Sequence, residues 1–299
     1  MAINTKVIKR RLKSIGSTKK ITKAMEMIAA AKMRKAVNAA IDTRAYAGLA
    51  WELLVDLSKT QKEQVPLLAT RPVEKILMII ITSNRGLCGS FNANIIKKTA
   101  AQMTREKAAV DVVGIGKKGA DFAKKMGYNL TAAFTNMTDT PNFDDALPIA
   151  KMVIDAYEKK SYDKVIVAYT DFKSALVQTA RLRQVLPISE SDLEKTLAEI
   201  TELSDDKTVV KNNLTDYLFE PNRLDVLKII LPRLVETQIY QTMLESSASE
   251  HSSRMVAMKN ASEAAKDMIS ELNLTFNKAR QAGITQEIAE IAGGAMALE

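Results

Sequence analysis

The sequence has very few of the residues on which much of enzyme chemistry depends. Its 299 residues include one cysteine, Cys88, and one histidine, His251. A single cysteine excludes a framework of internal disulfides and is typical of a reducing compartment. A single histidine argues against histidine-based metal sites and against catalytic triads that need an imidazole.

Long hydrophobic runs are missing as well. The longest strongly apolar run, Ile76 to Ile81, has the length of a strand, whereas a membrane-spanning helix needs about 20 apolar residues. The N-terminus also lacks the apolar region of a secretory signal, so we expect neither a spanning helix nor a signal peptide. With 46% hydrophobic residues, the chain can nevertheless build a substantial core.

Positive charge is concentrated at one end of the chain. The net charge is +8, yet residues 1–35 alone carry eleven basic side chains against one acidic residue, Glu26. The N-terminal segment therefore carries a net charge of +10, and the rest of the chain a net charge close to −2. Such a basic segment is either a solvated helix face or a surface for nucleic acid, an acidic membrane or an acidic protein.

Two long segments at the ends of the chain have the pattern of helices. No proline occurs from Asn4 to about Ser58 or after Pro232, and apolar residues recur every three or four positions in both segments. Both stripes are rich in alanine and methionine, and long helices need a packed apolar face to be stable. We therefore expect the two helices to pack on each other as an antiparallel coiled coil.

In the middle of the chain the hydrophobic pattern changes from that of long helices to that of alternating strands and helices. We expect strands at Lys75–Thr82, Val110–Ile115, Lys164–Tyr169 and Val177–Leu186. We expect helices at Asn94–Lys107, Gly119–Lys125 and Asp144–Lys159, and a polar surface excursion at Glu190–Asn213. Alternating strands and helices predict a mostly parallel sheet with crossover helices. The fold class is thus a central α/β, Rossmann-like domain at 73–220, between coiled-coil helices at 1–60 and 222–299.

One glycine motif favours a different interpretation, an NAD-dependent enzyme. Gly114, Gly116 and Gly119 form G-I-G-K-K-G between a strand and a helix, and Asp139 follows about 20 residues later. This is the pattern of a dinucleotide-binding loop, with the acidic residue on the ribose. However, the loop follows the second strand instead of the first, and no residue for hydride transfer is evident. A tight turn between strand and helix explains the pattern better.

The cysteine and the histidine have structural interpretations too. Cys88 lies in a glycine-containing loop, Asn84–Ser90, with no histidine near it in sequence, so a buried structural thiol is expected. His251 is expected to be a packed or solvent-facing helix residue. A coiled-coil protein that binds nucleic acid would explain the basic N-terminus, but the chain lacks aromatic interleaving and any known reader motif.

Five motifs are specific enough to point to a family. They are ITKAMEMIAAAKMRKA at Ile21–Ala36, SNRGLCGSFN at Ser83–Asn92, DYLFEP at Asp216–Pro221, RMVAMK at Arg254–Lys259 and NKARQAGITQEI at Asn277–Ile288. In this order, and over the whole chain, they closely resemble the gamma subunit of F-type ATP synthases.

This resemblance implies a rotor. In that family the coiled coil is a shaft inside a hexamer of alternating alpha and beta subunits, and catalysis takes place on beta. The central domain sits with the epsilon subunit on the ring of membrane c subunits. The resemblance therefore implies no cofactor, no nucleotide site and no nucleic-acid partner in this chain. It also implies membrane association through the complex alone, at the cytoplasmic face of the cell (inner) membrane.

The resemblance also assigns five residues to the beta subunit. Arg280 and Gln281 match the pair that faces the catch loop of beta, and Thr285 and Glu287 match nearby positions on the same helix. Met25 matches the position that faces the acidic lever of beta, which suits the basic N-terminal helix.

A second group of matching residues lies at the foot, the part of the central domain that meets the c ring in that family. Phe219 and Glu220 match positions that meet the c ring beside epsilon, with Tyr217 close by. Phe219 stands where some relatives have tyrosine, so a contact through a hydroxyl is lost there.

Overall fold

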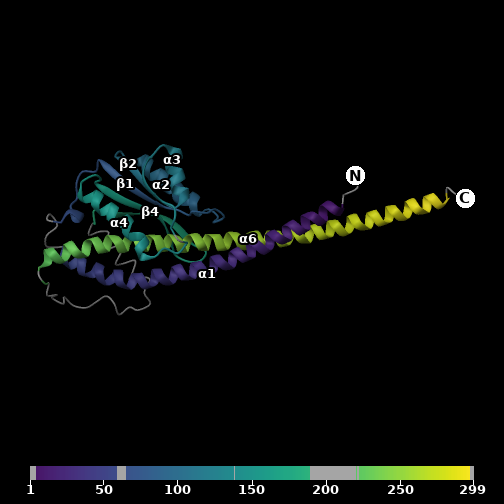
Figure 1. Cartoon of the computed structure of the whole chain (residues 1–299), viewed down its shortest axis with the longest axis horizontal. Coiled ribbons are helices and arrows are strands. Elements are labelled where there is room, and N and C mark those ends of the chain that lie inside the picture. Colours follow the sequence, from purple (N-terminus) through teal and green to yellow (C-terminus); the bar gives the residue numbers. More distant parts are fainter. Residues whose placement is uncertain (1–4, 59–64, 138, 189–219, 221, 297–299) are drawn as a thin grey trace. The chain divides into compact units, whose positions relative to one another are not determined.

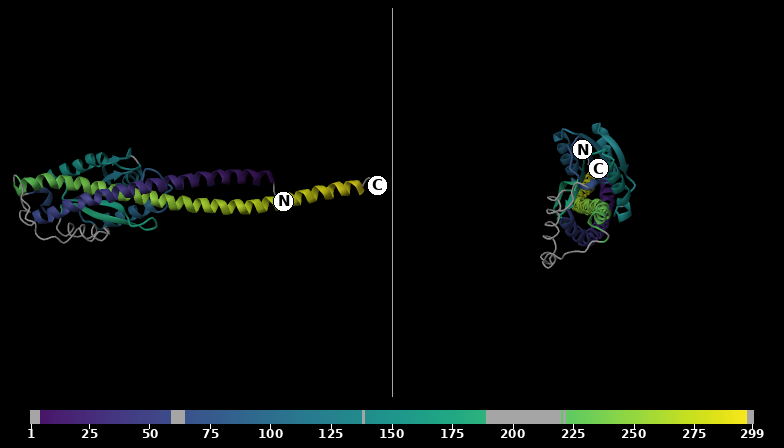
Figure 2. Two further views of the ribbon diagram at one scale, coloured as in Figure 1. Left: turned by 90° about the horizontal axis from the view of Figure 1, so that it is seen from below. Right: turned by 90° about the vertical axis from the view of Figure 1, so that its left-hand side faces the viewer.

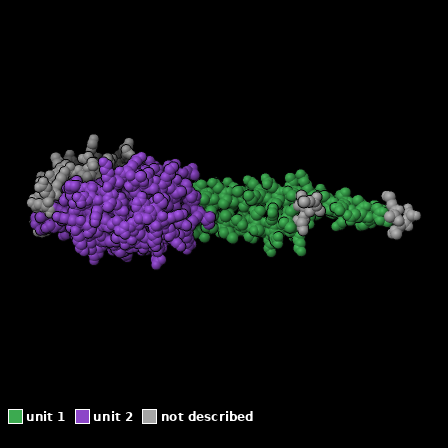
Figure 3. Space-filling model, turned by 90° about the horizontal axis from the view of Figure 1, so that it is seen from above, with its two compact units in different colours: residues 1–29, 254–299 green, residues 30–253 purple. Residues whose placement is uncertain are grey.

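The computed structural model describes residues 5–58, 65–137, 139–188, 220 and 222–296 (Figure 1). The chain divides into two compact units (Figure 3). Unit 1 contains residues 1–29 and 254–299, and unit 2 contains residues 30–253. Two helices belong to both units, α1 at Thr5–Ser58 and α6 at Arg223–Met296. No described helix has a stretch long and apolar enough to cross a bilayer.

Unit 1 is a pair of antiparallel helices. The start of α1 and the end of α6 lie side by side, and the last turns of α6 continue past the start of α1 (Figures 1 and 2). The side chains buried in this pair are mostly small or flexible: Ile8, Thr22 and Ala29 on α1, and Met258, Ser262 and Ala265 on α6. Small side chains allow close approach of the helices. The predicted antiparallel coiled coil is confirmed.

Unit 2 is built on one five-stranded sheet. The strands are β1 (Lys75–Ile81), β2 (Ala109–Ile115), β3 (Asn129–Phe134), β4 (Lys164–Phe172) and β5 (Gln178–Leu186), in the order β3-β2-β1-β4-β5. The helices between them are α2 (Phe91–Arg105), α3 (Lys117–Met126) and α4 (Phe143–Glu158), and a short 3-10 turn, η2, spans Pro66–Leu68. β1 to β4 are parallel, and β5 pairs antiparallel with β4.

Alternate residues of β1 reach opposite faces of the sheet, and both faces are covered. Ile76, Met78 and Ile80 pack with α2 and α3 on one face. Leu77, Ile79 and Ile81 pack with α4 and the first part of α6 on the other. A strand buried on both faces needs apolar side chains at every position, which explains the continuous run in β1.

The sequence predictions miss one strand of the sheet. Strand β3 was not predicted, because this edge strand is half-exposed and contains Ala132 and Ala133 in place of a run of valine and isoleucine. Strand β5 is antiparallel to β4, so the sheet is mostly parallel, as predicted. Helix α6 begins at Arg223, within the predicted range 222–299, and Pro232 lies inside it. Leu231, beside this proline, is buried. The four predicted strands and three predicted helices of the middle are confirmed, and Glu190–Asn213 lies outside the described residues.

Gly116 gives a test of how closely two loops approach. Its φ is +89°, and a Cβ at this position would lie 2.1 Å from the carbonyl oxygen of Thr82. Gly127, which ends α3, has a similar φ of +77° but no atom within 4 Å of a Cβ. Gly127→Ala should therefore lower the free energy of unfolding only by the backbone cost, about 1–2 kcal/mol. Gly116→Ala should cost more than about 3 kcal/mol, because the Thr82 backbone must also move. Urea unfolding of the two variants checks this; equal losses would show that the loops adjust freely.

Candidate functional site

The carboxyl end of the sheet is where a Rossmann-like fold binds its ligand. Here the first amides of α3 already have partners in the segment that follows β1. The amide of Lys117 donates to Asn84 Oδ1 at 3.0 Å, and that of Lys118 donates to the carbonyl of Ser83 at 3.2 Å. The amide of Gly119 donates to Thr82 Oγ1 at 2.7 Å. A phosphate would have to displace all three contacts to use this helix terminus.

The same packing explains the glycine motif. A Cβ on Gly114 would lie 3.0 Å from that of Ala120, and a Cβ on Gly119 would lie 3.0 Å from Thr82 Oγ1. The glycines allow the segment after β1 to lie directly on the turn between β2 and α3. This close contact supports the interpretation of the motif as a tight turn.

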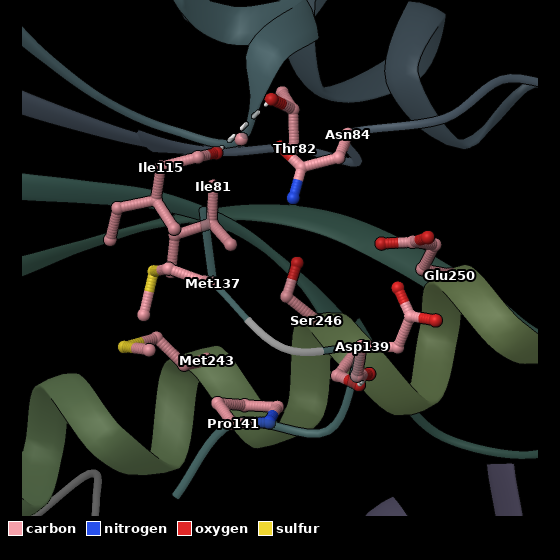
Figure 4. Close-up of a pocket in the computed structure, with 12 residues that line it drawn as sticks. Ile81, Thr82, Asn84, Ile115, Met137, Asp139, Pro141, Met243, Ser246 and Glu250 are labelled. Atoms are coloured by element: carbon pink, nitrogen blue, oxygen red, sulfur yellow. Dashed lines mark hydrogen bonds between the residues drawn. The ribbon is translucent and has the colours of Figure 1, made fainter. Parts of the chain in front are cut away.

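A small cavity remains at this edge of the sheet (Figure 4). Its volume is about 50 Å³. It lies between the ends of β1 and β2, the loop that follows β3, and α6, which contributes Met243, Ser246, Ser247 and Glu250. The buried Ser246 hydroxyl points toward the space below Asn84 (Figure 4). The cavity can hold one or two water molecules, whereas organic ligands occupy about 300–1,000 Å³.

Asp139, the candidate ribose contact, is engaged elsewhere. Its carboxylate forms an ion pair with Lys32 of α1. Its carbonyl oxygen accepts hydrogen bonds from Ser247 Oγ at 2.9 Å and from His251 Nε2 at 2.8 Å. The hydrogen bond and charge of Lys32 hold the pKa of Asp139 below the usual 3.8, against a smaller opposing effect of burial. The carboxylate is therefore ionised at neutral pH. Asp139 connects helices in this structure and does not face a ligand pocket of nucleotide size.

Cys88 and His251 are both packed side chains. Cys88 is buried, and the side-chain amide of Asn92 donates to its sulfur at 3.2 Å. His251 is 2% exposed and bonds to the loop that follows β3. Within the described part of the chain, no group of three histidine, cysteine or acidic side chains could hold a metal ion. These contacts favour structural roles for both residues.

The residues assigned to the beta subunit lie in unit 1. Arg280, Gln281, Thr285 and Glu287 are all exposed on α6, and Met25 of α1 is half-buried. The hydroxyl of Thr285 donates to the carbonyl of Gln281 at 3.0 Å, so it reinforces the helix. The structure therefore keeps this group of α6 side chains available to a partner.

An apolar stripe accompanies these polar residues. Ile284, Ile288 and Ile291 are 48%, 61% and 73% exposed. They are four and three residues apart, so they share one side of the helix. Exposed apolar stripes of this kind mark surfaces that another protein covers. At the foot, Glu220 is exposed, while Tyr217 and Phe219 lie outside the described residues.

Sequence reasoning did not find the junction of Lys32, Asp139, Ser247 and His251. These four residues are far apart in sequence, and no spacing rule connects them. The one local signal is the run of serines around His251, at 246–253, because small polar residues are unusual on a helix that packs against a sheet.

Comparisons with known proteins agree with this architecture. A family model described as ATP synthase matches residues 4–298. The ATP synthase gamma chain of Dehalococcoides mccartyi (strain CBDB1) is 41% identical over 298 residues, and the match covers 99% of each chain. The chain belongs to the ATP synthase gamma chain family.

Solved structures of ATP synthases have the same fold. A chain in the central stalk and c-ring structure of the Tetrahymena thermophila mitochondrial ATP synthase is 28% identical, with a TM-score of 0.61; the match covers 81% of this chain and 99% of that one. A chain in the mitochondrial ATP synthase of Euglena gracilis gives a TM-score of 0.65 at 19% identity, over 98% and 94% of the two chains. The second match shows the fold alone. Membership of the ATP synthase gamma chain family confirms the resemblance, while the role of each site residue stays a prediction.

The occupied amides of α3 lead to a prediction about nucleotides. The purified chain should show no binding heat with ATP or NAD in titration calorimetry, because the phosphate-binding groups are bonded to the segment after β1. Cys88→Ala, which does not touch those amides, serves as a control for the integrity of the loop. Micromolar binding of either nucleotide would contradict this account of the crevice.

Proposed function

We propose that this chain is the central rotor shaft of a rotary F-type ATP synthase. It couples proton flow through the membrane c ring to ATP synthesis or hydrolysis at the catalytic beta subunits. The observation that carries the proposal is the 41% identity, over nearly the whole length, to a chain named ATP synthase gamma chain. The match to a central stalk and c-ring structure supports it. The chain has no catalytic centre of its own in this proposal.

The surface of unit 1 suits a shaft enclosed by other subunits. Polar residues on the end of α6 flank an exposed apolar stripe, which a surrounding protein would cover. Basic side chains at the start of α1 are also mostly exposed; they are Lys6, Lys9, Arg10, Arg11, Lys13, Lys20 and Lys23. A cationic surface of this kind fits an acidic partner and orients it at long range.

We assign the contacts with beta to five residues. Arg280 and Gln281 grip the catch loop of beta, since arginine offers a fork of donors and glutamine both donates and accepts. Thr285 and Glu287 extend this contact along α6. Met25, on the basic helix α1, faces the acidic lever of beta.

The sheet-containing unit is assigned to the base of the rotor. Tyr217, Phe219 and Glu220 contact the c ring beside the epsilon subunit. The chain is then a peripheral protein at the cytoplasmic face of the cell membrane, held there through the complex. Nothing in this arrangement requires a cofactor or a nucleic acid.

The pair Arg280 and Gln281 gives the sharpest test of this assignment. If their contact with beta forms only at certain rotor angles, its loss changes the relative energies of those angles more than the stability of the helix. Arg280→Ala with Gln281→Ala should therefore enter the complex, yet lower ATP hydrolysis and ATP synthesis together. We expect a loss of about tenfold, which corresponds to about 1.4 kcal/mol in the barrier. Both rates are measured per assembled complex.

A matched control lies on the same helix. Lys259 and Asn260 are also exposed on α6, and like Arg280 and Gln281 they are a cation followed by a side-chain amide. Lys259→Ala with Asn260→Ala should leave both rates near those of the parent. Normal turnover in the Arg280 and Gln281 variant, or an equal loss in the control, would contradict the assignment of this pair to the contact with beta.

A further inference from the structure

Asp139 is the meeting point of three elements of unit 2. It lies in the loop between β3 and α4, and its carboxylate pairs with Lys32 of α1. Its carbonyl oxygen accepts from Ser247 and His251 of α6. We call these four residues the Asp139 junction. One residue of the sheet's loops is thereby bonded to both long helices.

The α6 side of the junction is buried and hydrogen-bonded. Ser247 and His251 are four residues apart, so they project from one side of the helix. Both are buried, at 8% and 2% exposure. A carbonyl oxygen can only accept, so Nε2 of His251 carries the proton in this contact. Two buried donors on one carbonyl fix the position of the loop on α6.

On the α1 side, the described side chains of unit 2 contribute one ion pair to the junction. Lys32 alone, among the described side chains at 30–43 of α1, has a hydrogen bond or ion pair with a loop of the sheet. The fully buried residues of this stretch, Ala36 and Ala40, are small, and the larger Met33 and Val37 are only half-buried. Alanine side chains interlock little, so their packing resists sliding or rolling of the helix less than larger side chains would. The ion pair between Lys32 and Asp139 therefore restrains the rotation of α1 about its axis more than the alanine packing does.

The junction lies close in sequence to where both helices leave unit 2. Unit 2 begins at Ala30 and ends at Ser253, so Lys32 and His251 are each two residues inside it. Lys32 and His251 are therefore among the first residues of the two helices within unit 2 that bond to another element. The side chains of Lys32 and Asp139 are 37% and 38% exposed, and such half-exposed pairs contribute little to overall stability.

We propose that Lys32 and Asp139 are positioning residues for torque transfer, holding α1 at a fixed angle against the sheet and α6. This inference rests on the proposed rotor function. It assigns the pair a mechanical role: when the ion pair is absent, α1 rolls on its alanine seam, and part of each rotation step is lost before it reaches the sheet.

A charge exchange tests the proposal in the assembled complex. Lys32→Glu and Asp139→Lys each place like charges together, whereas the double variant restores an ion pair of reversed polarity. We expect each single variant to lower the ratio of protons pumped to ATP hydrolysed by about two- to fivefold, a range that fits a half-exposed ion pair. The double variant should recover most of the ratio. Asp42→Lys makes the same charge change as Asp139→Lys at an exposed position of α1 and should leave the ratio unchanged.

Further measurements keep the outcomes distinct. If either repulsive variant fails to assemble, Lys32→Met and Asp139→Asn remove the ion pair without repulsion and keep the Asp139 carbonyl. Torsional stiffness of the shaft, from single-molecule angular fluctuations, should fall in these variants while the melting temperature changes little. Unchanged ratio and stiffness, or a double variant as impaired as the singles, would overturn the proposal. If the parent chain itself supports no ATP-driven pumping, the proposed function fails instead.

Discussion

The packing of α6 is the interaction on which the rest of the structure depends. In unit 2 its first part buries Leu227, Leu231 and Val235 against the sheet and α4. In unit 1 its later part packs on the start of α1. A single continuous helix therefore belongs to both cores, and a change in its register would disturb them together. The composition of α6 changes along its length: leucine and valine are buried in its first part, serines gather in its middle, and alanine and methionine are buried where it packs on α1 in unit 1.

The middle of α6 also decides what the Rossmann-like sheet can do. Serines and His251 pack over the carboxyl end of the sheet, and the segment after β1 occupies the amides of α3. The crevice that holds a cofactor in related folds holds polar contacts between helix and sheet here. At this edge the sheet supports a helix, and the glycine motif allows close packing of the backbone.

Elements with strong local patterns could be predicted from the sequence. The run KILMIII required a strand buried on both faces, and the proline-free termini required long helices. Edge strand β3 could not be predicted, because Ala132 and Ala133 carry no strong strand preference. Helix α6 continues through Pro232, as the predicted range 222–299 requires, and the neighbouring Leu231 is buried. The Asp139 junction depends on contacts between distant residues, so only the folded chain reveals it.

The central claim is that the chain rotates as a shaft, and a label on unit 2 tests it most directly. A cysteine introduced at exposed Lys125, in a Cys88→Ser background, would carry a bead while the alpha and beta subunits are fixed to a surface. Upon addition of ATP, the account predicts continuous rotation of the bead in one direction, at a rate that follows ATP hydrolysis. A bead that stays still in complexes that hydrolyse ATP at the normal rate would contradict the account.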